Sequence, residues 1–193
     1  MKKLEKTFII MILLSAALSL SLISGGGILF TISMLSLSML YLVFGFALCN
    51  GIGFRGLFKK RSYRDTTFWR IAGGIAIGHT LSLTIIGILF AFMFWEGAMI
   101  MLRTSMLTWL LVSIVILIRY FRSPDRYARN ALVRLSIWGL IGMIFLFTPT
   151  MTWVKIQYRA HPAYIKALEA AYADRDNDAL WQKVKEEHEK TFK

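Results

Sequence analysis

His79 is the side chain in this sequence with the clearest potential for chemistry inside a membrane. It stands within an uncharged, apolar run, where an imidazole can carry protons or bind a ligand. The hydroxyls of Ser82, Thr84 and Ser113 are the groups that would share a cavity with it. The alternative, which we favour, is a neutral imidazole hydrogen-bonded to a neighbouring hydroxyl or carbonyl group. A polar site for a small solute therefore stands as a hypothesis beside an ordinary packing role.

The rest of the sequence contains no recognisable catalytic, metal-binding or cofactor-binding set. A haem in most membrane cytochromes needs two axial ligands, whereas no second histidine lies in a predicted span. Asp and Glu are absent from the predicted span interiors, although carboxylates commonly form the ion sites of coupled transporters. The single Cys49 excludes an intramolecular disulfide and a cysteine-based metal cluster. We therefore expect no catalytic residue, no metal and no cofactor.

Lys and Arg cluster in two short segments between apolar runs. Loops of this kind stay on the cytoplasmic side of a membrane and meet anionic lipid headgroups. A lipid-modifying enzyme could use them to hold a phosphate headgroup, but no nucleophile or general base accompanies them. We interpret these cations as topology determinants and headgroup contacts. The set comprises Arg55, Lys59, Lys60, Arg61, Arg64, Arg119, Arg122, Arg126 and Arg129.

The apolar runs predict about five transmembrane helices. No charged residue occurs from Thr7 to Phe54, which at about 1.5 Å per residue is roughly twice the thickness of a hydrocarbon core. Two helices therefore fold back at the glycines 25–27. The predicted spans are 8–23, 28–50, 71–95, 99–118 and 135–153. Whether 99–118 spans fully is left open because Arg103 interrupts it, but omitting it would place five arginines on the outer side.

The fold class that follows is an all-α, polytopic membrane helix bundle over residues 1–154 with a helical tail over 155–193. Pro162 suits the first position of a helix, and acidic residues around 174–178 separate a second helix from it. The predicted hairpin carries an apolar stripe that needs a surface to cover: this bundle, the headgroup layer, another copy or another subunit. Its residues are Tyr164, Ile165, Leu168, Trp181, Val184 and Phe192.

Small residues mark a close contact between helices in the third predicted span. Gly74 and Gly78 form a small-xxx-small pair, which lets two helix backbones approach each other. We expect internal packing at this pair, with a dimer face as the alternative. No internal repeat is evident in the sequence.

The distribution of charge predicts the topology. The chain has 193 residues, a net charge of +12 and only 18% charged residues, and its cations lie between apolar runs rather than on one basic face. We therefore expect anionic lipids and no nucleic acid as partners. The predicted orientation places the N-terminus and both basic loops in the cytoplasm and the nearly neutral tail in the periplasm or outside the cell. Compact loops favour a bacterial inner membrane.

Three functional hypotheses follow. The leading one is a non-enzymatic accessory or assembly subunit that docks in the bilayer and holds another membrane protein, or a second copy, through its tail. The second is a small-solute transporter or channel-like protein built around His79. The third is a lipid-modifying enzyme that uses the loop arginines. The sequence favours a protein that is not an enzyme.

Overall fold

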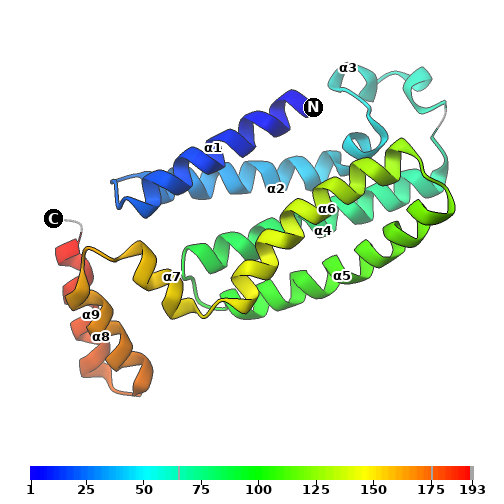
Figure 1. Cartoon of the computed structure of the whole chain (residues 1–193). Coiled ribbons are helices and arrows are strands. Elements are labelled where there is room, and N and C mark those ends of the chain that lie inside the picture. The colour runs from blue at the N-terminus through cyan, green and yellow to red at the C-terminus, as the bar shows by residue number, and fades with distance from the viewer. Residues whose placement is uncertain (65, 175, 192–193) are drawn as a thin grey trace.

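The computed structural model describes residues 1–64, 66–174 and 176–191, which form helices joined by turns and contain no β-strand. Five long helices lie side by side along one direction, and shorter helices follow at one end (Figure 1). The long helices are α1 (Lys2–Leu20), α2 (Gly26–Asn50), α4 (Phe68–Phe92), α5 (Ala98–Arg122) and α6 (Arg126–Phe147). The shorter ones are α3 (Phe54–Leu57), η1 (Lys60–Tyr63), α7 (Thr150–Gln157), α8 (Pro162–Ala173) and α9 (Asp178–Thr191).

Four of the long helices, α2, α4, α5 and α6, are long and apolar enough to cross a membrane. The predicted all-α bundle with a helical hairpin after it is confirmed. The first predicted span corresponds to α1, whose 19 residues reach about 28 Å. Its first two turns carry Lys2, Lys3, Glu5 and Lys6, and this charge separates it from the other four helices. The crossing by α1 remains a prediction.

The helix boundaries differ from the predicted ones for local reasons. Helix α6 begins at Arg126 rather than near 135, because the Asp125 carboxylate caps its first turn by accepting a hydrogen bond from the Ala128 amide at 2.7 Å. The same helix ends at Phe147, ahead of Pro149, and a separate short helix follows. At the other end of the chain, α1 extends back to Lys2 instead of starting at Phe8.

The two turns at the outer end of the bundle share one construction. Helices α1 and α4 both end in a Schellman-type pattern, in which the left-handed position holds Leu22 (φ +53°) and Phe94 (φ +55°) instead of the usual glycine. Gly25 and Gly97, also left-handed, are the N-cap residues that precede α2 and α5. The last residues of α1 and α4, at positions 20 and 92, lie 72 positions apart in the chain. The last residues of α2 and α5, at positions 50 and 122, are separated by the same 72 positions. The structure thus contains a repeated helical hairpin, which the sequence analysis missed.

The bundle is tightest between α2 and α4. A Cβ atom added at Gly78 would lie 2.9 Å from the Cα of Gly45 and would also meet the Tyr41 carbonyl oxygen, so the backbones touch here. Gly74 faces Phe46 in the same contact. The predicted small-xxx-small pair therefore lies inside the chain at a helix–helix contact.

The tail forms a second, smaller apolar cluster at the end of the bundle opposite the N-terminus (Figure 1). Helices α8 and α9 pack against each other, with Pro162 at the predicted first position of α8. Leu168 and Val184 are buried between them, and Leu22 and Phe94 from the two outer turns pack against the same cluster. The cluster also contains Val154 of α7 and Tyr158, so the hairpin, α7 and the two outer turns share one apolar contact region.

Candidate functional site

A buried ion pair joins α1 and α6, which are the first and the last of the five long helices along the chain. The Arg134 guanidinium donates to both carboxylate oxygens of Glu5, from Nε to Oε1 at 2.6 Å and from Nη2 to Oε2 at 2.7 Å. The side chains are only 11% and 9% exposed. Such a bidentate pair satisfies both charges in a medium where an unpaired charge is very costly. Glu5 and Arg134 lie 129 positions apart in the chain.

The pair belongs to a larger buried network. The Tyr41 hydroxyl donates to Glu5 Oε1 at 2.7 Å, and the Trp138 indole nitrogen donates to the Tyr41 hydroxyl oxygen at 3.4 Å. Arg134 also donates from Nη1 to the Asn130 carbonyl oxygen at 2.9 Å. The Glu5 carboxylate therefore accepts three hydrogen bonds, and its charge is compensated by Arg134. This arrangement fixes α1 against α2 and α6 and leaves no free base for proton abstraction at Glu5.

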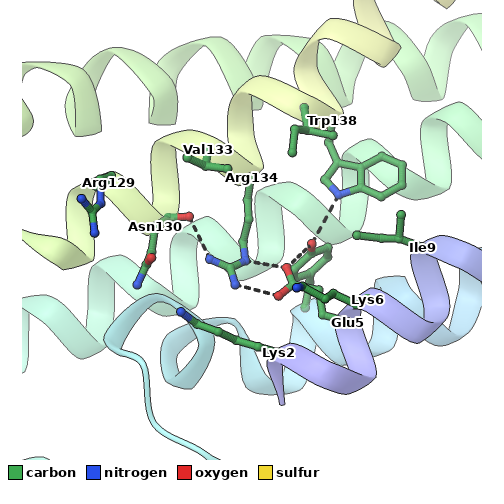
Figure 2. A pocket seen from close by; sticks show the side chains of 11 residues that line it. Lys2, Glu5, Lys6, Ile9, Arg129, Asn130, Val133, Arg134 and Trp138 are labelled. Atoms are coloured by element: carbon green, nitrogen blue, oxygen red, sulfur yellow. Dashed lines mark hydrogen bonds and ion pairs between the residues drawn. The ribbon is translucent and has the colours of Figure 1, made fainter.

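A cleft of about 340 Å³ lies over this network, between α1 and α6 (Figure 2). Lys2, Lys6 and Arg129 line it with exposed ammonium and guanidinium groups. Ile9, Val133 and Ile137 line it with apolar surface. The site combines positive charge near the helix ends with an apolar wall further along the same helices.

A second ion-pair cluster holds the same end of the bundle. Asp125 Oδ2 accepts from Arg70 at 2.7 Å and from Arg119 at 3.1 Å, which connects α4 and α5 to the start of α6. Burial alone would raise the pKa of Asp125. The hydrogen bond from the Ala128 amide and the two guanidinium groups outweigh burial and hold the pKa of this carboxyl below its usual value.

The structure does not bring the predicted intramembrane polar residues together. His79 is exposed on the surface of α4. Ser82 shares a 2.7 Å hydrogen bond with Ser38, and Thr84 donates to the carbonyl of Thr80, one turn earlier. Ser113 lies on α5 in a separate small pocket, where its buried hydroxyl has no hydrogen-bond partner among the described residues. This scattered arrangement counts against a solute cavity formed by these four side chains.

The loop cations predicted to contact headgroups lie near the end of the bundle that also holds the N-terminus (Figure 1). Arg119 is half-buried in the Asp125 cluster, whereas Arg129 lines the cleft. All except Arg119 are exposed: Arg55, Lys59, Lys60, Arg61, Arg64, Arg122, Arg126 and Arg129.

The apolar stripe predicted on the tail packs largely within the protein. Leu168 and Val184 are buried, and Tyr164, Ile165 and Trp181 are half-buried against the same cluster. Burial raises the pKa of Tyr164 to about 12, with smaller contributions from its tyrosine neighbours. The remaining predicted residue, Phe192, lies outside the described residues.

Glu5, Arg134 and Tyr41 are the site residues that sequence reasoning missed. One signal was present: Glu5 is the only acidic residue among Lys2, Lys3 and Lys6. An acidic residue at the membrane end of a predicted span is costly to bury unless it is paired, and it is therefore a candidate for an ion pair such as the one with Arg134.

The all-α bundle and its four long apolar helices define a helical membrane protein. Comparison of the chain with protein-family models, with curated proteins and with solved structures finds no match.

Proposed function

We propose that this protein is a non-enzymatic accessory or assembly subunit of a membrane complex, which holds another membrane protein through its C-terminal hairpin. The observation that carries the proposal is the way the hairpin is fixed. Leu22 and Phe94 occupy left-handed backbone conformations, which cost a non-glycine residue about 1–2 kcal/mol each, and both side chains pack against the tail cluster. Strain at two equivalent turns is a reasonable cost when a surface must be presented in a defined orientation.

The surface available to a partner is the outward side of the hairpin. Tyr172 is 44% exposed and makes an edge-to-face contact with Trp181, with ring centroids 5.8 Å apart. Aromatic side chains with charged residues around them are typical of protein interfaces. Exposed Lys183, Lys185 and Glu186 on α9 supply charges of both signs. The buried residues Leu168 and Val184 then hold the hairpin together, and the exposed Tyr172 with the half-buried Trp181 contacts the partner.

The proposed orientation places the N-terminus and both basic loops in the cytoplasm and the hairpin in the periplasm or outside the cell, in a bacterial inner membrane. Two features support it. The basic loops and the hairpin lie at opposite ends of the bundle (Figure 1). The cations concentrate at the first of these ends, as the positive-inside bias requires of a cytoplasmic face.

Purification of the tagged full-length protein in a mild detergent tests the proposal, with mass spectrometry of the co-purified proteins. We expect one stoichiometric partner for the natural sequence. Tyr172→Asp places a charge beside Trp181 on the outward side of the hairpin and should lose that partner while insertion and thermal stability persist. Tyr172→Phe keeps the ring and should retain it, and Lys166→Ala, at an exposed position outside this surface, serves as a control.

Two results would contradict the proposal. The first is the absence of any stoichiometric partner from the full-length chain. The second is retention of the partner, at the level of the natural sequence, by both Tyr172→Asp and a chain that ends at residue 160. The hairpin would then contribute nothing to the contact.

A further inference from the structure

The cleft between α1 and α6 is lined by more positive than negative charge. Lys2, Lys6 and Arg129 line it without an ion-pair partner among the described residues. The acidic group that lines the cleft is the Glu5 carboxylate, and it already accepts hydrogen bonds from Arg134 and Tyr41. Four cations and one carboxylate leave the lining with three positive charges. An anion of that order of charge, or an anionic group on a larger molecule, complements the site.

The shape of the cleft distinguishes a lipid from a soluble anion. Arg129 lies one turn into α6, and Val133 and Ile137 follow it at four-residue steps on the same side of the helix. The distance from Arg129 to Ile137 along the helix is about 12 Å. Val133 and Ile137 are 54% and 49% exposed, and Ile9 of α1 forms the facing wall. The cations thus stand at the depth of headgroups, and the apolar wall continues toward the depth of acyl chains.

We propose that this cleft binds one anionic phospholipid, with the phosphate among Lys2, Lys6 and Arg129 and one acyl chain along Ile9, Val133 and Ile137. The buried Glu5–Arg134 pair forms the base of the site and holds its two walls at a fixed separation. Figure 2 shows Lys2 and Lys6 of α1 beside the pair and Arg129 of α6 farther along the cleft, beyond Asn130. The site is independent of the hairpin and of any partner that the hairpin holds.

Fluorescence quenching of Trp138 by brominated lipids tests the assignment, because this indole lines the cleft. The full-length protein is reconstituted in phosphatidylcholine vesicles that contain increasing fractions of dibrominated phosphatidylglycerol or dibrominated phosphatidylcholine. The same titration on Trp138→Phe is subtracted to isolate the signal of Trp138. We expect the anionic lipid to quench at a mole fraction at least about tenfold lower than the zwitterionic one, since each cation near a membrane surface favours an anionic lipid by about fivefold.

Neutralisation of the three cations should remove this preference. The variant Lys2→Gln/Lys6→Gln/Arg129→Gln is expected to quench equally with both lipids. The matched variant Arg55→Gln/Lys59→Gln/Arg64→Gln removes the same number of exposed loop cations outside the cleft and should keep the preference of the natural sequence.

Three results would overturn the assignment. Equal quenching by the two lipids in the natural sequence would show that the cleft does not select anionic headgroups. A preference that survives in the cleft variant would place the selection elsewhere. Loss of the preference in millimolar inorganic phosphate would identify a soluble anion as the ligand.

Discussion

At the scale of single residues, the Glu5–Arg134 pair is a buried contact in which two charges compensate each other. Removal of one partner from a buried ion pair leaves an uncompensated charge, which destabilises a protein by about 3–5 kcal/mol. We therefore expect Glu5→Gln to lower the melting temperature of the detergent-purified protein strongly. Glu5→Gln/Arg134→Met removes both charges and should recover most of the loss.

An exposed ion pair provides the matched control for this experiment. Lys155 and Glu169 are 2.8 Å apart with side chains 56% and 43% exposed, and pairs of this kind contribute about 0–1 kcal/mol. Glu169→Gln should therefore change the melting temperature little. A Glu5→Gln variant as stable as Glu169→Gln, or a double variant less stable than Glu5→Gln, would contradict a buried, mutually compensated pair.

Asp125 makes the stability of the same end of the bundle dependent on pH. Its pKa in the folded protein lies below the ordinary 3.8, so the unfolded chain takes up a proton first as the pH falls. The stabilisation is complete above pH 3.8 and is lost as the pH falls through the lower, folded value. Asp125→Asn retains a helix-capping side chain but loses the charge interaction with Arg70 and Arg119.

The measurement for Asp125 is the melting temperature as a function of pH for both sequences. The natural sequence should be more stable at neutral pH, and the two curves should converge below pH 3.8. Parallel curves with a constant offset would show that the carboxylate charge is not what stabilises this cluster.

At the scale of helices, the contact between α2 and α4 depends on backbone proximity. A side chain at Gly78 would meet the Tyr41 carbonyl and the Gly45 backbone, neither of which can rotate away. Gly78→Val should destabilise the protein by about 1–3 kcal/mol or more through overpacking. At Gly53 a Cβ would meet nothing within 4 Å, so Gly53→Ala should leave the melting temperature nearly unchanged. Equal stability of the two variants would contradict this contact.

The paired turns show how an element can be repeated without obvious sequence similarity. Leu22 and Phe94 differ in side chain but share a backbone conformation, and each is followed three positions later by a left-handed glycine. The repeat is defined by hydrogen bonds and φ values. A search for recurring residues therefore does not reveal it, although the glycines 25 and 97 are its visible trace.

At the scale of the whole molecule, the orientation in the membrane is open to direct measurement. In a Cys49→Ala background, single cysteines at Lys3, Lys59 and Lys183 report on the start of α1, the first basic loop and the hairpin. We expect an impermeant maleimide to label Lys183→Cys in intact cells, and the other two only after permeabilisation. Labelling of Lys3→Cys from outside would show that α1 does not cross the membrane as predicted.

The sequence by itself determined the helical class, the approximate positions of the four long apolar helices, and the two basic segments. These features are local or nearly so, because hydropathy, helix rise and the thickness of a bilayer together define a span. The turn at the glycines 25–27 and Pro162 at the start of α8 could be predicted for the same reason.

Only the tertiary structure decided which charges pair and which apolar stripes remain exposed. The Glu5–Arg134 contact depends on how α1 and α6 are rotated and shifted against α2, and no periodicity within either helix encodes that relation. The tail stripe looked available to a partner, but Leu168 and Val184 are buried in the apolar cluster that forms between the hairpin, α7 and the outer turns. His79, the most conspicuous polar residue in the sequence, lies apart from the cleft because its rotation about α4 directs it outward.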